Sequence, residues 1–202
     1  MTDAPHSAPE HTPSEALAML LEGNERFASG EPAHPRQDVD RRTMLSTGQA
    51  PFAVILGCSD SRVPVELLFD QGFGDIFVVR NAGHVLGLST QASVEFAVAQ
   101  LGVQVVLVMG HESCGAVAAT VSYIETGAEL PGQMPVLVRE VRPHLDEAHP
   151  AGDAVEAHVL GTLSDLLERS DLVRDARASG DVVVAGGVYA LADGRVRLVT
   201  QH

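Results

Sequence analysis

The chain has 202 residues, of which 27 are acidic and 13 basic, and its net charge is −14. This acidic balance argues against nucleic acid and against an anionic membrane surface as partners, and apolar runs of about eight residues are too short to cross a bilayer. Two cysteines, no tryptophan and a start without basic or long apolar stretches indicate a cytoplasmic protein whose thiols are free, metal-bound or catalytic rather than paired.

The length suits one domain that carries an arm. Residues 1–11 lack hydrophobic periodicity, and we expect them to form a flexible tail in front of a single domain over residues 12–202. Thr12 and Glu15 resemble a capping box before leucines at helical spacing, and a proline-broken loop separates this helix from a second, short one. The arm is predicted over 12–47, with helices over 12–29 and 38–46.

Beyond this arm, short apolar runs alternate with helical patterns. The runs have no polar face, which is typical of parallel strands covered on both sides. The turn at Asp193-Gly194 indicates a closing hairpin. Strands are predicted over 53–57, 76–79, 103–109, 182–189 and 196–200, and helices over 89–101, 113–126 and 154–169. We therefore predict an α/β fold, with a central, mostly parallel β-sheet flanked by helices, an N-terminal helical arm and a C-terminal hairpin.

Side chains capable of binding a metal follow the first and third of these strands. Cys58, Asp60 and Arg62 follow the first, and His111 and Cys114 follow the third. Ligands of an open α/β sheet bind beyond the carboxyl ends of its strands, so these residues should lie together. If His111 and Cys114 share a helical turn, their side chains lie about 5–6 Å apart on one face. Two thiolates and an imidazole form a zinc-preferring set, with a fourth position for water or Asp60.

Asp60 and Arg62 are the second feature of this predicted site. A carboxylate beside a guanidinium stays ionised and is held in one orientation. Asp60 could therefore orient a zinc-bound hydroxide or, if Arg62 turns away, bind zinc directly in a closed, inactive state. Taken singly, a cysteine is most often a buried small hydrophobic residue, and a structural zinc site is a further alternative. Both cysteines at strand ends, with Asp, Arg and His beside them, favour a catalytic zinc.

The remaining histidines have ordinary expected roles, with one exception. His84 follows the second strand at the same edge of the sheet, and it could line the site or pass a proton to buffer. His158 is expected on a helix face and His34 in a polar loop. Contact with solvent is expected for His6, His11, His144, His149 and His202.

Two of these motifs resemble the signature of a known protein family. The motifs Cys58-Ser59-Asp60-Ser61-Arg62 and His111-Glu112-Ser113-Cys114 are similar to the paired signature of the β-class carbonic anhydrases of bacterial type. The resemblance extends over roughly residues 14–200, and the other similar segments are 21–27, 77–83, 93–98 and 187–194.

The resemblance implies the same fold and one zinc ion per subunit, held by Cys58, His111 and Cys114. Asp60 and Arg62 would be the catalytic dyad, with Asp60 a fourth zinc ligand in the closed state only. A small apolar pocket would bind carbon dioxide, a small molecule without a net dipole. The residues that match substrate-binding positions of the family are Gln49, Phe77, Ala82, Gly83 and Phe96.

The implied reaction is the reversible hydration of carbon dioxide to bicarbonate and a proton by zinc-hydroxide attack. Members of the family are dimers or larger, so we expect a homodimer or homotetramer in which the arm over 12–47 reaches the partner and the pocket is shared. The alternatives are a carbon disulfide or carbonyl sulfide hydrolase on the same scaffold, or a non-catalytic zinc- or bicarbonate-binding module.

One position departs from the family pattern. Some bacterial members bind an inhibitory bicarbonate at a second site made of a tryptophan, an arginine and a tyrosine. Arg80 and Tyr189 match two of these residues, but Ile55 occupies the tryptophan position. The resemblance therefore argues against bicarbonate regulation.

Overall fold

The computed structural model describes residues 11–145 and 151–202. Most of the predicted tail of residues 1–11 lies outside these ranges, as do His6 and His149. Within the described ranges, no helix is both long and apolar enough to span a membrane.

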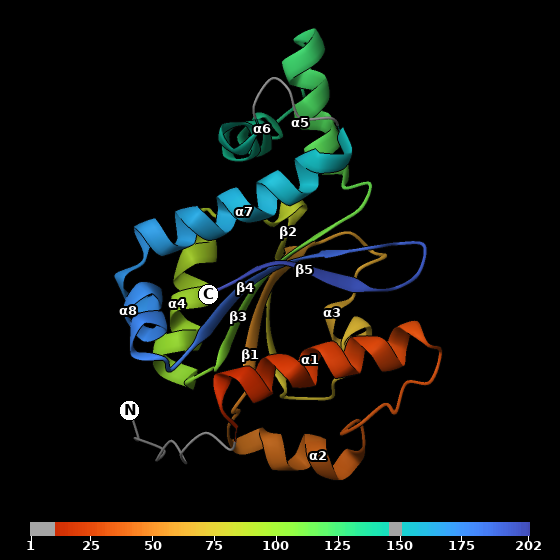
Figure 1. Cartoon of the computed structure of the whole chain (residues 1–202), viewed down its shortest axis with the longest axis vertical. Coiled ribbons are helices and arrows are strands. Elements are labelled where there is room, and N and C mark those ends of the chain that lie inside the picture. Colours follow the sequence, from red (N-terminus) through yellow and green to blue (C-terminus); the bar gives the residue numbers. More distant parts are fainter. Residues whose placement is uncertain (1–10, 146–150) are drawn as a thin grey trace.

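A five-stranded sheet forms the centre of the molecule (Figure 1). The strand order is β2-β1-β3-β4-β5, with the first four strands parallel and β5 antiparallel to β4. The prediction of a mostly parallel sheet with a C-terminal hairpin is thus confirmed. The strands are β1 (Ala53–Cys58), β2 (Ile76–Asn81), β3 (Val105–His111), β4 (Val183–Tyr189) and β5 (Val196–Gln201).

Helices flank this sheet, as the sequence predicts. Thr12 caps the first helix through the expected reciprocal bonds with Glu15. Three of the helices were not predicted, because elements of four to nine residues next to prolines or to another helix show too little periodicity. The helices are α1 (Pro13–Ala28), α2 (Val39–Met44), α3 (Val65–Leu68), α4 (Leu88–Leu101), α5 (Gly115–Thr126), α6 (Pro135–Val141), α7 (Ala151–Arg169) and α8 (Asp171–Ser179), with short 3₁₀ turns η1 (Leu45–Thr47), η2 (Ala82–His84) and η3 (Arg142–His144).

Two hydrophobic cores form because neighbouring residues of a strand point to opposite faces of the sheet. Ile55 and Leu107 face the side covered by α1, where Leu20 is fully buried. Val54 and Val106 face the side covered by α4, α7 and α8. Every residue of β1 and β3 is buried. This explains why both strands appear in the sequence as unbroken apolar runs.

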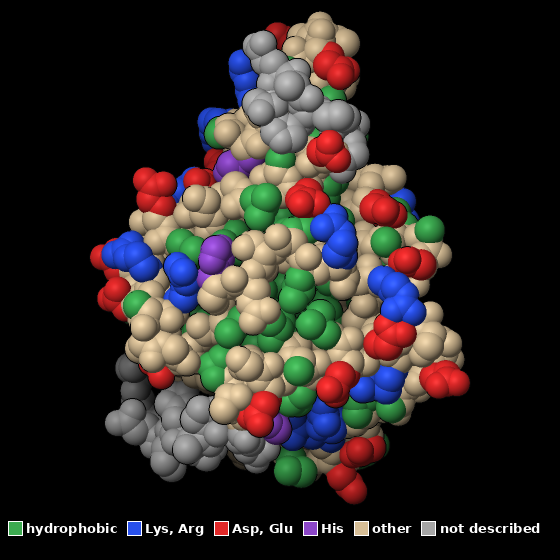
Figure 2. All heavy atoms as spheres, in the orientation of Figure 1, with side chains coloured by type: hydrophobic (Ala, Val, Ile, Leu, Met, Phe, Trp, Pro, Cys, Tyr) green, Lys and Arg blue, Asp and Glu red, His purple; other side chains and the backbone are tan. Residues whose placement is uncertain are grey.

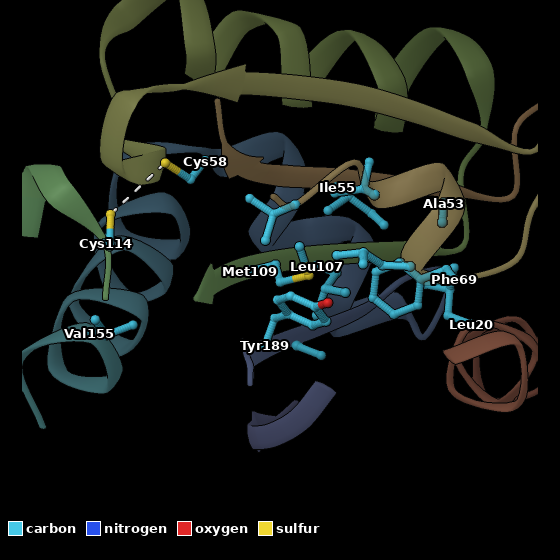
Figure 3. Close-up of a cluster of buried hydrophobic side chains, with 14 of the residues drawn as sticks. Leu20, Ala53, Ile55, Cys58, Phe69, Leu107, Met109, Cys114, Val155 and Tyr189 are labelled. Atoms are coloured by element: carbon cyan, nitrogen blue, oxygen red, sulfur yellow. Dashed lines mark hydrogen bonds between the residues drawn. The ribbon is translucent and has the colours of Figure 1, made fainter. Parts of the chain in front are cut away.

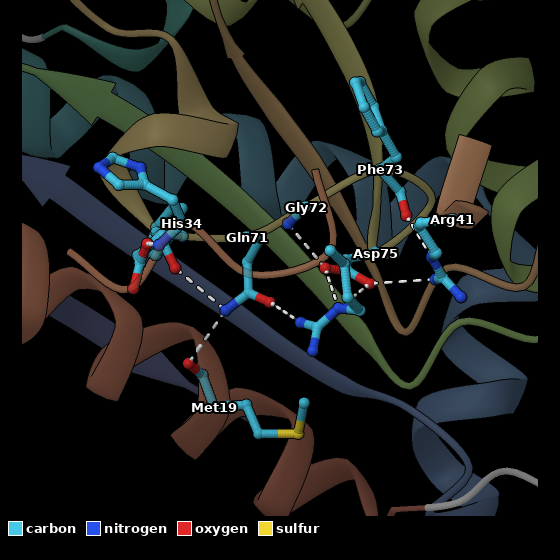
Figure 4. Close-up of polar contacts among 10 residues, drawn as sticks. Met19, His34, Arg41, Gln71, Gly72, Phe73 and Asp75 are labelled. Carbon is cyan, nitrogen blue, oxygen red and sulfur yellow. Dashed lines mark hydrogen bonds and ion pairs between the residues drawn. The ribbon is translucent and has the colours of Figure 1, made fainter. Parts of the chain in front are cut away.

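Charged side chains fasten the segment between α1 and α2 to the loop before β2 (Figure 4). Arg36 Nε donates to both carboxylate oxygens of Asp75, at 2.9 and 2.7 Å, and Arg36 Nη2 donates to Gln71 Oε1 at 3.0 Å. Arg41 Nε donates to the carbonyl oxygen of Phe73 at 3.0 Å. Because Asp75 is almost fully buried, its charge requires these partners. The predicted arm is therefore tied to its own chain at this point.

The two helices of this arm differ in their packing. Helix α1 buries Leu17 and Leu20 against the sheet of its own chain. Helix α2 has no buried residue, and Val39 and Met44 expose about two thirds of their surface, 63% and 68%. Within the arm, α2 is thus the helix whose apolar side chains stay exposed.

Candidate active site

The predicted site residues meet at one edge of the sheet. Cys58 is the last residue of β1, and its register partner Asn81 is the last residue of β2. His111 ends β3, the neighbour of β1 on the other side. The carboxyl ends of parallel strands therefore bring these residues together, as the sequence predicts.

Cys58, His111 and Cys114 form a compact cluster. Their ligand atoms all lie within 4.8 Å of one another, and the two sulfur atoms are 4.0 Å apart at one end of the buried cluster in Figure 3. The expectation that His111 and Cys114 share a helical turn is wrong. Strand β3 ends at His111, Ser113 has a positive φ of 54°, and Cys114 is the N-cap of α5. A tight turn, rather than a helix, folds the thiol back towards the imidazole.

When it is neutral, the imidazole of His111 presents a lone pair to this cluster. Its Nδ1 lies 2.8 Å from the carbonyl oxygen of Glu112, so Nδ1–H donates and the neutral ring keeps Nε2 unprotonated. Nε2 is buried and has no hydrogen-bond partner among the described residues. A buried acceptor without a partner is costly, whereas a metal-bound histidine characteristically donates its other N–H to a carbonyl. The tautomer therefore suits a metal ligand.

The two sulfur atoms of this cluster are hydrogen-bonded to each other. The hydrogen bond to Cys114 lowers the pKa of the Cys58 thiol below its usual range, and the Gly83 N–H at 3.3 Å from its sulfur acts in the same direction. The same hydrogen bond, together with burial, raises the pKa of Cys114. The contacts around Cys58 therefore favour its ionised form more than those around Cys114 do. A divalent metal that binds both sulfurs would displace the remaining thiol proton.

Asp60 and Arg62 form the predicted pair beside this cluster. Arg62 Nε and Nη2 donate to Asp60 Oδ1 and Oδ2 at 2.9 and 2.7 Å, and the Arg62 N–H donates to Oδ1 at 2.9 Å. These bonds hold the pKa of the Asp60 carboxyl well below its usual range. Asp60 Oδ2 lies 3.9 Å from His111 Nε2, so the carboxylate borders the cluster. Arg62 Nη2 also reaches the carbonyl oxygen of Ser113, at 3.3 Å.

Two supporting contacts were not predicted in these roles. Arg80 donates to the carbonyl oxygens of Cys58 and Asp60, at 2.8 and 2.7 Å, and so fixes the segment between them. Gly83 has a φ of 74°, and a Cβ there would lie 2.8 Å from the Ala116 Cβ. Glycine thus allows the backbone N–H to approach the Cys58 sulfur. The place of a residue in the sequence does not reveal such contacts with backbone atoms.

The three positions that correspond to the bicarbonate site of some family members have structural roles in this chain. Ile55 is fully buried in the hydrophobic core. Tyr189 ends β4, and its side chain packs in the same core (Figure 3). Arg80 is occupied by the two carbonyl oxygens near the site.

Of the residues expected to bind substrate, two lie beside the metal-binding cluster and three lie away from it. Ala82 and Gly83 lie in η2, next to Cys58. Phe77 stands four residues before the end of β2, and its ring centre is 6.1 Å from that of Phe96 on α4. Gln49 lines a hollow with Phe73 and Gly74, at the amino-terminal edge of the sheet.

Gln49 and Cys58 consequently lie at opposite ends of β1. Ala53 begins the strand and Cys58 ends it, five residues later. At about 3.3 Å per residue, β1 separates its two ends by roughly 16 Å. The metal cluster and Gln49 of one chain therefore do not form one site.

Three histidines pack together behind the cluster. The expectation that His144 contacts solvent is wrong, whereas His158 lies on helix α7, as expected. The His144 side chain is 9% exposed and stacks on His158, which is fully buried. His84 is also fully buried, and burial keeps its pKa well below the ordinary value. An imidazole without solvent access that stays neutral is poorly suited to pass protons to buffer.

Comparisons with known proteins agree with this geometry. Residues 53–196 match the family described as carbonic anhydrase. A carbonic anhydrase of Mycolicibacterium smegmatis is 44% identical over 195 residues, covering 94% of this chain and 95% of that protein. Carbonic anhydrase 2 of Mycobacterium tuberculosis is 43% identical over 195 residues and is covered to 94%, as is this chain. A β-carbonic anhydrase of Coccomyxa, solved in complex with acetazolamide, gives a TM-score of 0.70 at 29% identity and covers 92% of this chain and 87% of that one.

These relatives favour neither a carbon disulfide or carbonyl sulfide hydrolase nor a non-catalytic module. The cluster of Cys58, His111 and Cys114 is the one group of such side chains that could hold a metal within the part of the chain that the structure describes. It lies where the β-class signature predicts it. The chain therefore belongs to the β class of the carbonic anhydrase family, lyases that interconvert carbon dioxide and bicarbonate.

Proposed function

We propose that this carbonic anhydrase uses one zinc ion per subunit, held by Cys58, His111 and Cys114. The observation that carries the proposal is the buried His111 Nε2, which has no hydrogen-bond partner among the described residues and lies within 4.8 Å of both sulfurs. Two thiolates and one imidazole are a typical zinc ligand set, and three protein ligands leave a fourth position for water.

Zinc in such a site lowers the pKa of bound water to about 7, a value known from carbonic anhydrases and metalloproteases, and so supplies hydroxide near neutral pH. Asp60 accepts a hydrogen bond from the attacking group and thereby orients its lone pair towards carbon dioxide. Arg62 keeps the carboxylate ionised and fixed through the two-pronged contact. Ala82 and Gly83 form the wall of the substrate space beside Cys58.

We propose that the accessible, active state prevails near neutral pH. Its support is the pairing of Asp60 with Arg62, which holds the carboxylate away from a direct ligand position. In the closed state Asp60 would leave Arg62 and would serve as the fourth zinc ligand. Breaking a charge-assisted, two-pronged pair opposes that change.

We further propose that Gln49, Phe77 and Phe96 serve the site of a partner subunit. Their support is their distance from the metal cluster of the same chain and their exposure. All six residues of β2 are partly exposed, and Phe96 is 47% exposed. A homodimer or homotetramer, joined in part through α2, would cover these surfaces.

The face shown in Figure 2 offers an additional surface for assembly. Hydrophobic side chains gather over the sheet between α1 and α7, with acidic and basic side chains around them. An apolar centre with a polar rim is the common pattern of subunit interfaces.

A cytoplasmic location is also proposed. Cys58 and Cys114 are free thiols with sulfur atoms 4.0 Å apart. A reducing compartment keeps such a pair from oxidising and available to a metal.

The experiment that tests the proposed zinc function is stopped-flow hydration of carbon dioxide at pH 7 and pH 8.5, before and after chelation. We expect activity at both values, loss of activity with the metal, and recovery when zinc is added back. Activity in metal-free protein would contradict the zinc proposal. Activity only above about pH 8 would contradict the accessible state at neutral pH. Zinc-loaded protein without activity at either pH would favour a non-catalytic module.

A further inference from the structure

A series of hydrogen bonds connects the Cys58 sulfur, through Gly83, to His158 on α7. The Gly83 N–H donates to the Cys58 sulfur at 3.3 Å, and the Gly83 carbonyl oxygen lies 2.7 Å from His158 Nε2. A carbonyl oxygen can only accept, so His158 donates from Nε2. One residue, Gly83, is thus held on one side by a metal-binding thiolate and on the other by a buried imidazole.

The opposite edge of the His158 ring is also bonded. Burial lowers the pKa of His158 to about 4, so the ring is neutral and its Nδ1 carries a lone pair. His144 Nδ1 lies 2.8 Å away and therefore donates to it. His144 Nε2 in turn lies 3.4 Å from Asp165 Oδ2, and Asp165 also pairs with Arg169. The contacts of the ring with the Gly83 carbonyl oxygen and with His144 Nδ1 fix both the tautomer and the orientation of His158.

Helix α7 is shaped to accept the His144 ring. A Cβ on Gly161 would lie 2.2 Å from His144 Cγ, so a side chain there would displace the ring. The rings of His144 and His158 stack with centres 5.0 Å apart. A glycine inside a helix costs about 0.5–1 kcal/mol relative to alanine, and here it provides the space for His144.

This arrangement does not form a proton path. Its link to the metal cluster is the Gly83 residue, whose carbonyl oxygen carries no proton to pass on. Both ring nitrogens of the neighbouring His84 lack hydrogen-bond partners among the described residues. These contacts are therefore suited to holding the Gly83 backbone in place rather than to moving a proton.

We propose that His158 is a positioning residue of the metal centre. Backed by His144, it holds the η2 backbone so that the Gly83 N–H stays aimed at the Cys58 sulfur. A hydrogen bond to a metal-bound thiolate fixes its direction and moderates its charge, and such outer contacts contribute to metal affinity. The proposal rests on the proposed metal centre, because it concerns the groups around one of its ligands.

The first test replaces His158 by leucine and measures zinc affinity by competition with a chromophoric chelator. Loss of an outer-shell contact typically weakens metal binding about 10–100-fold, and we expect about tenfold because His158 acts through Gly83. In the cobalt-substituted protein, the thiolate-to-cobalt charge-transfer band should shift. His158→Gln, which retains an N–H donor, should restore most of the affinity and the parent band.

Leu166→Ala is the matched control. Leu166 is also fully buried on α7, but it packs in the core on the far side of the sheet. We expect it to lower the melting temperature while zinc affinity and the cobalt spectrum remain unchanged. An equal loss of affinity in Leu166→Ala would overturn the proposal, and so would parent affinity and spectrum in His158→Leu.

The hydrogen bond itself is tested on metal-free protein by long-range ¹⁵N NMR of the imidazoles. We expect His158 to be protonated at Nε2 and not at Nδ1, and Gly161→Ala, which displaces His144, to change the Nδ1 shift. Protonation at Nδ1 would contradict the proposal. If no variant and no parent protein bound metal at Cys58, the proposed zinc function would fail, whereas this NMR result would still decide whether His158 holds Gly83.

Discussion

Replacing Cys58 by serine is expected to remove zinc and, with it, carbon dioxide hydration. The Cys58 sulfur contacts both the Cys114 sulfur and the Gly83 N–H. A serine hydroxyl stays protonated at neutral pH and is a poor zinc ligand. Loss of an outer-shell partner alone costs about 10–100-fold in affinity, so loss of a ligand should cost at least about a hundredfold. Metal content by mass spectrometry and stopped-flow hydration measure both effects.

Ala53→Ser provides the matched control for this substitution. Ala53 is fully buried at the other end of β1, so the variant introduces the same hydroxyl into the same strand away from the metal cluster. We expect a less stable protein that keeps a full complement of zinc. A Cys58→Ser protein that retained both full zinc content and hydration activity would show that Cys58 is not a ligand.

Replacing Asp60 by asparagine should separate catalysis from metal binding. We expect kcat/KM to fall about 10²-fold with unchanged zinc content, the lower end of what a positioned acid–base group contributes. Asparagine has nearly the same shape, but it lacks the charge that Arg62 holds at 2.7–2.9 Å and is a weaker hydrogen-bond acceptor. Stopped-flow rates normalised to bound zinc give the measurement.

The loss of activity in Asp60→Asn is expected to be independent of pH between pH 7 and pH 8.5. Arg62 holds the pKa of Asp60 well below its usual range, so the carboxylate stays ionised from pH 7 to pH 8.5. The loss caused by Asp60→Asn should therefore be the same at both values. Asp175→Asn, which changes an exposed carboxylate on α8, is the control and should leave hydration unchanged. Parent activity in Asp60→Asn, or a deficit that disappears at one of the two pH values, would be inconsistent with the proposed role.

Local sequence signals are sufficient to predict most of the fold. β1 and β3 are continuous apolar runs because both faces of each strand are covered, and Thr12 with Glu15 marks the start of α1. Helix α8 was missed because a single residue, Ser170, separates it from α7. Short elements of this kind depend on packing that periodicity does not reveal.

In the site, too, local sequence patterns predict some features, whereas contacts between distant residues are not visible in the sequence. The spacing of Cys58, His111 and Cys114 was enough to predict the cluster, because each residue lies near the end of a recognisable strand. The partner of His158 is the carbonyl oxygen of Gly83, 75 residues away, and no pattern along the chain points to it.

The resemblance implies a substrate pocket shared between subunits, and β1 separates Gln49 from the metal-binding cluster of its own chain. A resemblance between motifs indicates candidate binding residues, but not which copy of the chain supplies them.

The count of sulfur atoms around bound zinc tests the central claim most directly. X-ray absorption of the zinc-loaded protein near pH 8 should show two sulfur atoms at about 2.3 Å and two nitrogen or oxygen atoms at about 2.0–2.1 Å, which correspond to Cys58, Cys114, His111 and water. A zinc ion without sulfur ligands, or with a single one, would contradict the assignment of the metal centre.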